Sequence, residues 1–221
     1  MAFVLTYNTL VQEIENYLQR TDATFVKDIP VFIMLGQRRI CRELKILGFR
    51  EVVTGNLIAG QQNLQKQANW LNTSSFNIGI NKNPGDTGYN TRVQILQRSY
   101  EYLRIYWPNP RLLNQPKYFA DYLETPITYG TFLIAPTPDE NYPYELIYYG
   151  IPQFIDENNQ TNFMTSSYPD ILLYACLLET ASYLRDDDRI QVWSNYYDKA
   201  KAALGEEDMK RIYDGYSKRG G

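Results

Sequence analysis

Residues 167–184 constrain the fold more than any other part of this sequence. Ser167 can accept a hydrogen bond from the backbone N–H of Asp170, and Pro169 stands where its missing N–H does no harm, so a helix is predicted to begin here. From 171 to 178 every residue is apolar or aromatic, which leaves this helix without a solvated stripe for two turns. It must therefore be covered nearly all round, either within one domain or partly by another subunit.

The composition indicates a globular protein. A chain of 221 residues with 44% hydrophobic content has enough material for one sizeable core or a core with a subdomain. No apolar run reaches the roughly 18 residues of a membrane span, and residues 1–5 lack the features of a signal peptide, so we expect no membrane partner. Twenty tyrosines suit partly wet subunit interfaces or a tyrosine-rich β-subdomain.

Charge and cysteine content narrow the functional classes. A net charge of −3 argues against a protein whose main task is to grip nucleic acid. Cys41 and Cys176 both lie in apolar helical patterns, where they act as small hydrophobes; a disulfide between them is the alternative.

Two amphipathic helices are predicted at the start of the chain. Thr6 is the expected cap of the first, over 7–18, and Asp28 with Pro30 is the expected start of the second, which runs to about residue 46. The outer face of the second helix carries four basic residues: Arg38, Arg39, Arg42 and Lys45. This face is interpreted as solvated, with contact to an acidic partner or to DNA as the alternatives.

The middle of the chain changes to strand periodicity. A strand is predicted over 49–58, short strands over 76–80 and 93–96, and a short helix over 100–105 capped by Ser99. Residues 131–135 and 144–149 are predicted to form a hairpin with a proline-rich tip.

The last third returns to helical periodicity. Trp193, Tyr197 and Leu204 share one face of a long helix for which Gly205 is the expected stop. The predicted fold is α+β, mainly α: a bundle of about four helices from 1–48 and 166–205, a β-rich insertion over 49–165 and an extended C-terminal arm over 206–221. The arm is either a frayed terminus or a segment that orders on a partner.

The sequence offers little for catalysis. It contains no histidine, no phosphate-binding loop and no dinucleotide-binding glycine motif, so no catalytic residue, cofactor or metal ligand is assigned. Residues 186–188, three aspartates, are interpreted as a helix–helix loop, with a hard cation as the alternative. Asp156, Glu157 and Glu179 leave open a carboxylate pair of the glycosidase type.

Seven segments, taken in order, resemble the head-to-tail adaptors of tailed bacteriophages, particularly the tail accessory or head-completion proteins of short-tailed phages. They are Thr6-Tyr-Asn-Thr-Leu-Val-Gln-Glu-Ile-Glu-Asn-Tyr-Leu, Ile29-Pro-Val-Phe-Ile, Gln37-Arg-Arg-Ile-Cys-Arg-Glu-Leu, Pro116-Lys-Tyr-Phe-Ala, Phe132-Leu-Ile-Ala-Pro-Thr-Pro-Asp, Tyr144-Glu-Leu-Ile-Tyr-Tyr and Pro169-Asp-Ile-Leu-Leu-Tyr-Ala-Cys-Leu-Leu-Glu. The resemblance is weakest over 72–90.

The resemblance implies a structural virion protein, not an enzyme. It implies a ring of twelve copies at the head–tail junction, assembled in the host cytoplasm, that docks under the portal protein, extends the DNA channel and carries the downstream tail or nozzle protein. Genomic DNA would pass through the lumen without sequence-specific binding. The basic face at 38–45 would meet a partner or the lumen. The C-terminal arm would bind the portal, with these contact residues: Ile212, Tyr213, Tyr216, Lys218 and Arg219.

Two other functional classes stay open at this point. One is a carboxylate-dependent hydrolase of cell-wall glycan carried on the tail. The other is a monomeric regulatory DNA-binding protein, which the charge and the lack of a recognition helix disfavour.

Overall fold

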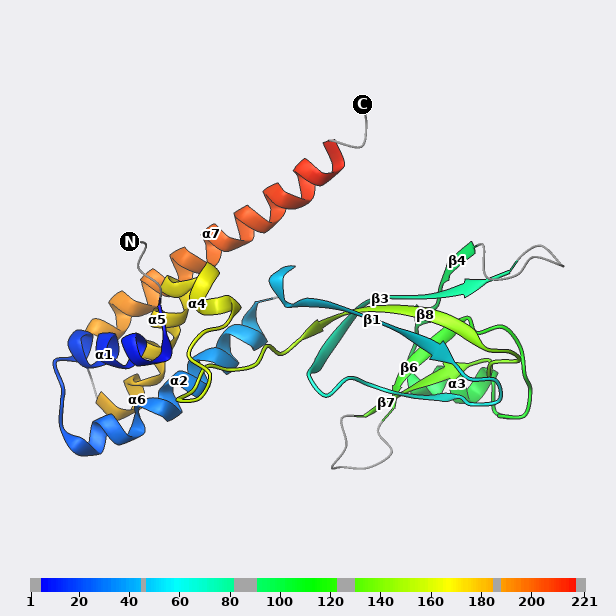
Figure 1. Ribbon diagram of the computed structural model, residues 1–221, viewed down its shortest axis with the longest axis horizontal. Coiled ribbons are helices and arrows are strands. Elements are labelled where there is room, and N and C mark those ends of the chain that lie inside the picture. The colour runs from blue at the N-terminus through cyan, green and yellow to red at the C-terminus, as the bar shows by residue number, and fades with distance from the viewer. Residues whose placement is uncertain (1–4, 45–46, 82–90, 123–129, 185–187, 218–221) are drawn as a thin grey trace. The chain divides into compact units, whose positions relative to one another are not determined.

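The chain folds into two compact units (Figure 1). The computed structural model describes residues 5–44, 47–81, 91–122, 130–184 and 188–217, without the side chains of 47, 182 and 208–217. The helical unit comprises Met1–Gly48 and Pro152–Gly221, and the β unit comprises Phe49–Ile151.

The described part of the helical unit contains six α-helices. They are α1 (Tyr7–Leu18), α2 (Ala23–Glu43), α4 (Phe163–Ser167), α5 (Pro169–Glu179), α6 (Ala181–Leu184) and α7 (Arg189–Ser217). The predicted cap of α1 is confirmed, because the backbone N–H of Thr9 donates to Thr6 Oγ1 at 3.2 Å and the N–H of Thr6 donates to Thr9 Oγ1 at 2.7 Å.

Helix α2 begins earlier than predicted. Asp22 caps it by accepting from the N–H of Phe25 at 3.2 Å, so Pro30 lies inside the helix instead of at its start. Phe25, Ile29 and Ile33 are fully buried along one face. We attribute the tolerance of Pro30 to this apolar face, which already begins at Phe25 and outweighs the lost backbone hydrogen bond.

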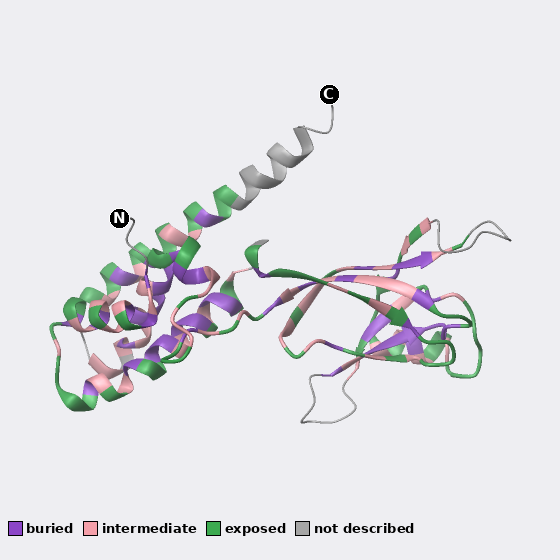
Figure 2. Cartoon of the chain, viewed as in Figure 1, coloured by how far each residue is buried: buried purple, intermediate pink, exposed green. Residues whose placement is uncertain are grey.

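Helix α5 is the covered helix that the sequence predicts. Ile171, Leu172, Ala175, Cys176 and Leu177 are buried. Figure 2 shows the buried residues of the helical unit in purple. The predicted cap is wrong: Ser167 ends α4, and Tyr168 is the N-cap of α5 without a side-chain bond. The capping box stands one short helix earlier, where Asn162 and Thr165 bond each other's backbone N–H groups.

Helix α7 continues past the predicted stop. Trp193, Tyr197 and Leu204 are buried on one face as expected, but the helix runs through Gly205 to Ser217. Glycine in a helix interior costs only about 1 kcal/mol, which does not end a helix by itself. The expected extended arm over 206–221 is therefore helical as far as residue 217.

The β unit is built from two four-stranded sheets and one α-helix, within the residues described. One sheet has the order β1-β8-β3-β4 and the other the order β2-β7-β6-β5. The elements are η1 (Leu47–Phe49, a 3-10 turn leading in), β1 (Arg50–Leu57), β2 (Asn63–Gln65), β3 (Trp70–Ile80), β4 (Thr91–Gln94), β5 (Leu96–Gln97), α3 (Tyr100–Tyr106), β6 (Tyr118–Tyr122), β7 (Thr131–Ala135) and β8 (Tyr142–Gly150). The predicted Ser99 cap of α3 is confirmed by its bond from the N–H of Tyr102 at 3.2 Å.

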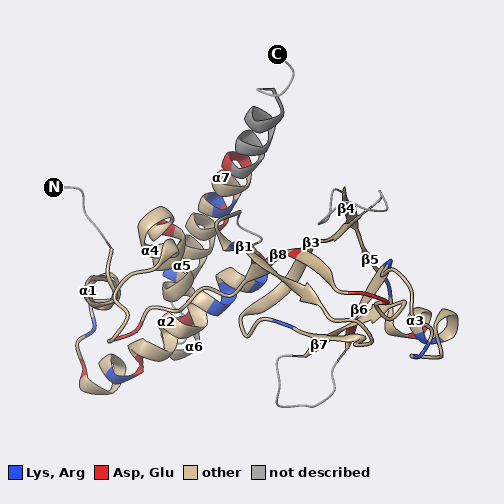
Figure 3. Cartoon of the chain, turned by 45° about the vertical axis from the view of Figure 1, so that its right-hand side comes forward, with Lys and Arg blue, Asp and Glu red and all other residues tan. Residues whose placement is uncertain are grey.

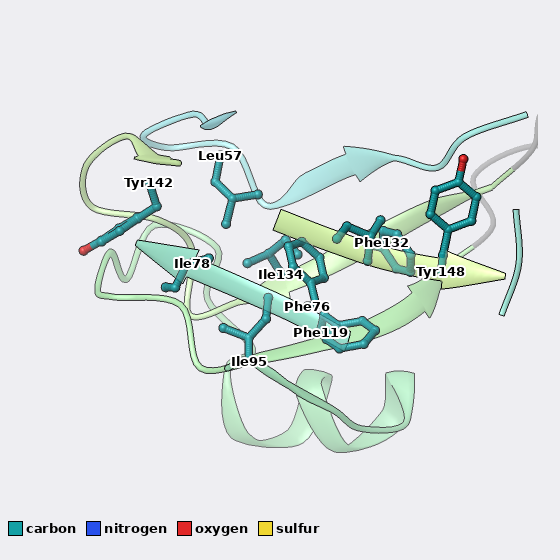
Figure 4. Packing of buried hydrophobic residues seen from close by; sticks show 10 residues of the cluster. Leu57, Phe76, Ile78, Ile95, Phe119, Phe132, Ile134, Tyr142 and Tyr148 are labelled. Carbon is teal, nitrogen blue, oxygen red and sulfur yellow. The ribbon is translucent and has the colours of Figure 1, made fainter. Parts of the chain in front are cut away.

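The two sheets enclose an aromatic core (Figure 4). Phe76 from β3 meets Phe119 from β6 and Phe132 from β7 at ring-centroid distances of 5.3 and 5.8 Å. On the other face of β7, Leu133 and Ala135 pack with Leu103 of α3. Both faces of β7 are covered, which fits its apolar sequence from Phe132 to Ala135.

The expected mainly-α bundle is wrong. The described residues form six helices in the helical unit, not a four-helix bundle, together with eight strands in two sheets. The predicted hairpin is also wrong, because β7 pairs with β2 and β6 whereas β8 pairs with β1 and β3. The proline-rich segment after β7 carries the chain from one sheet to the other.

The chain enters and leaves the β unit on neighbouring strands. Arg50, the first residue of β1, pairs with Tyr149 near the end of β8. A polar cluster lies beside this pair: the Glu51 carboxylate accepts from the Tyr148 hydroxyl and from Asn69 Nδ2, each at 2.7 Å. The backbone N–H of Ile151 donates to the Asn69 carbonyl at 2.7 Å.

Candidate functional site

The predicted basic face of α2 lies partly in an interhelical ion-pair network. Arg39 Nε donates to Glu179 Oε1 of α5 at 2.6 Å, and Arg39 Nη1 lies 3.7 Å from Glu43 Oε1 one turn away. Glu43 Oε2 accepts from Lys201 Nζ at 2.9 Å and from the Tyr197 hydroxyl at 3.1 Å, both on α7. The network therefore joins α2, α5 and α7, and Arg39 is not a free cation.

The ionisation of Glu43 follows from these contacts. Partial burial by itself raises the pKa of Glu43, but the bonds and charges of Lys201, Tyr197 and Arg39 outweigh burial and hold the pKa below its usual value. Burial and the Glu43 charge raise the pKa of Tyr197. Glu43 is therefore ionised and Tyr197 is neutral at neutral pH.

The remaining basic residues of the face differ in their surroundings. Arg38 and Arg42 are exposed, and Lys45 lies outside the described residues. Figure 3 shows basic residues along α2 in blue. Arg42 lines a hollow with Leu35, Arg39, Glu43 and Glu179. Arg38 and Arg42 are thus the described members that are available to a partner or to DNA.

The predicted portal-binding residues lie at the end of the chain. Ile212, Tyr213 and Tyr216 belong to α7, but their side chains lie outside the described part of the structure. Lys218 and Arg219 lie outside the described residues altogether.

A buried amide that the sequence reasoning missed holds the segment before α4 to α2. Gln37 is fully buried; its Oε1 accepts from the N–H of Ile155 at 2.9 Å, and its Nε2 donates to the Ile155 carbonyl at 3.3 Å. Asn162 Nδ2 also donates to Gln37 Oε1 at 3.2 Å. A glutamine next to Arg38 on an amphipathic helix gives no sequence signal for this role.

A second missed group is a buried lysine in the β unit. The Lys66 ammonium lies 2.6 Å from Asp121 Oδ1 and 3.6 Å from the centroid of the Trp70 ring. Gln97 Nε2 donates to the other Asp121 oxygen at 2.9 Å. The pair connects residues on both sheets and is structural.

Two of the three carboxylates considered for hydrolysis, Asp156 and Glu179, have structural partners. Asp156 Oδ1 accepts from the backbone N–H groups of Asn158 and Asn159, both at 2.8 Å, and Glu179 is bound by Arg39. The described residues hold no cluster of three or more potential metal ligands, and Asp186 and Asp187 lie outside them. Cys41 and Cys176 are free and buried, and burial raises the pKa of the Cys41 thiol to about 11.

Among the helices of the described residues, none is long and apolar enough to cross a membrane.

The ion pairs and buried polar groups described above connect elements of the fold, and several large apolar side chains of the described chain remain exposed. The sequence model of the SU10 adaptor protein family matches residues 5–219. The chain belongs to this family and is a structural bacteriophage protein, an adaptor of the virion that associates with portal and tail proteins. A search among curated proteins finds no match for the chain.

Proposed function

We propose that this protein forms a ring of twelve copies that docks beneath the portal, extends the DNA channel and carries the downstream tail protein. The observation behind the proposal is the family match over 5–219, nearly the whole chain. A cyclic ring uses two different patches on each subunit, and a two-unit chain offers them. The proposed location is the head–tail junction, after assembly in the host cytoplasm.

The C-terminal end of α7 is the proposed portal contact. Leu204 is buried, and the helix continues for 13 residues to Ser217, a length of about 20 Å at 1.5 Å per residue. Ile212, Tyr213 and Tyr216 on this segment, followed by Lys218 and Arg219, are the proposed contact residues.

Two truncations test this contact. Removal of 206–221 is expected to abolish co-purification with the portal, whereas removal of 218–221 tests Lys218 and Arg219 alone. Circular dichroism of each variant controls for folding of the remaining chain. Unchanged portal attachment after removal of 206–221 would refute the proposed contact.

Passage of DNA through the ring is the second part of the proposal. The net charge of −3 supports a lumen that does not retain phosphates. Arg38, Arg42 and Lys45 are proposed to face a partner or this lumen. The variant Arg38→Glu with Arg42→Glu is expected to alter portal attachment or DNA ejection, measured separately on assembled particles. Normal values for both would remove this face from the proposal.

A further inference from the structure

Helix α3 and the segment around it form an exposed surface on the β unit. Ile105 is 72% exposed and Tyr106 is 63% exposed, although both belong to a short helix that packs on a sheet. Basic residues lie on both sides of them in the segment 98–117. We call this set the α3 surface: Arg98, Arg104, Ile105, Tyr106, Arg111 and Lys117.

The aromatic rings of this region already contact one another and two arginines. The Arg98 guanidinium lies 5.9 Å from the Tyr102 ring centroid and 5.6 Å from that of Tyr118. The Tyr102 and Tyr106 centroids lie 4.5 Å apart.

Arg104 occupies a similar place on the other side of the helix. Its Nε donates to the Tyr100 hydroxyl at 3.0 Å, and the Tyr100 ring stacks on Tyr122 at 5.1 Å. The two arginines are therefore held in position by rings, and no described carboxylate forms an ion pair with either of them.

The charge of the α3 surface is opposite to that of the helical unit. The segment 98–117 contains four basic residues and one acidic residue, Glu101, for a charge of +3. The β unit as a whole has eight of each and is neutral. The helical unit has 14 basic and 17 acidic residues and thus carries the entire −3 of the chain.

We infer that the α3 surface binds the helical unit of a second copy of this chain. The inference rests on the proposed ring, because a head-to-tail ring requires two unlike, complementary surfaces on each subunit. Arginine and tyrosine around an apolar centre are typical of protein interfaces, and the opposite charges favour the encounter.

Two other occupants fit the surface less well. Contact between two α3 surfaces would bring like charges together. Single-stranded nucleic acid requires free aromatic faces for base stacking, whereas the tyrosine faces here contact other rings and arginines, and Ile105 has no stacking face.

Site-specific photo-cross-linking tests the inference. The full-length chain with p-benzoylphenylalanine in place of Ile105 is irradiated alone and in the presence of portal, and the cross-linked peptides are identified by mass spectrometry. We expect a cross-link to a second copy, within 1–48 or 152–221. The yield is expected to fall about tenfold in the variant Arg111→Glu with Lys117→Glu, because like charges then face each other.

The two altered residues are exposed, so the variant is expected to fold. Arg50→Glu, an equally charged change at an exposed residue of the β unit outside 98–117, serves as the matched control and is expected to retain the cross-link. High salt should also lower the yield for the unaltered surface, since the Debye length is about 3 Å at 1 M.

Several results would overturn the inference. They are a cross-link to the β unit of the second copy, cross-links only to another protein or to DNA, an unchanged yield after charge reversal, and the absence of any cross-link. Portal attachment is scored in the same samples. Rings on the portal without the cross-link would contradict the inference alone, and the cross-link without portal attachment would contradict the portal-docking proposal alone.

Discussion

Replacement of Gln37 by leucine should destabilise the helical unit. The change keeps a side chain of similar size but leaves the buried N–H and carbonyl of Ile155 without their partners, at 2.9 and 3.3 Å from the amide. Each unsatisfied buried group costs about 1–3 kcal/mol, and the buried leucine regains part of this. We expect a net loss of about 2–4 kcal/mol in the free energy of unfolding.

Urea unfolding followed by circular dichroism, at two protein concentrations to separate folding from association, measures this loss. Gln12→Leu on the exposed face of α1 is the matched control and should change stability by less than about 0.5 kcal/mol. Hydrogen exchange gives a local readout, because the Ile155 amide should lose protection in Gln37→Leu. If Gln37→Leu is as stable as the control and Ile155 stays protected, the assigned role of the amide is wrong.

Three further predictions concern helix contact, pH and a buried charge. A Cβ on Gly36 would lie 2.9 Å from the Cys176 backbone nitrogen, so Gly36→Ala should lower the free energy of unfolding by about 1–3 kcal/mol, measured by thermal unfolding. Gly205 has open space around it, so Gly205→Ala should instead raise helix content. Equal effects of the two substitutions would refute the close contact at Gly36. The pKa of Glu43 is lower in the folded state, so the stabilisation from its ionised carboxylate is present above the unfolded pKa of 4.5 and is lost as pH falls through the folded pKa. Because Glu43 is partly exposed, this stabilisation amounts to at most about 1 kcal/mol. Unfolding free energies measured over a pH series should lose this pH dependence in the variant Glu43→Gln. Lys66→Met should cost less than about 1 kcal/mol, because a side chain of similar length still fills the buried site beside Trp70 and the exposed Asp121 keeps its bond from Gln97. Lys66→Ala should cost about 2–3 kcal/mol, because it leaves this site empty. The order of the two melting temperatures checks this prediction.

Local chemistry explains what could be predicted from the sequence. Thr6 and Ser99 cap their helices as expected because a cap depends on residues three positions apart. The continuous apolar run of α5 predicted a covered helix for a similar local reason.

Non-local pairing explains the errors. The turn after β7 gave no indication that β8 belongs to the other sheet, since strand partners are chosen by packing across the whole unit. Arg39 looked like an exposed cation because its partner Glu179 lies 140 residues away. The burial of Gln37 and Lys66 likewise depends on distant residues, Ile155 and Asp121.

The pairing of Arg50 with Tyr149 has a consequence for how this adaptor can change over time. Neighbouring strands lie about 5 Å apart, so the two ends of the β unit are separated by little more than one residue of chain. If the β unit were removed, a loop of a few residues could join residues 48 and 152. The β unit is therefore connected in a way that suits its exchange as a module, with the sequence of the helical unit left unchanged.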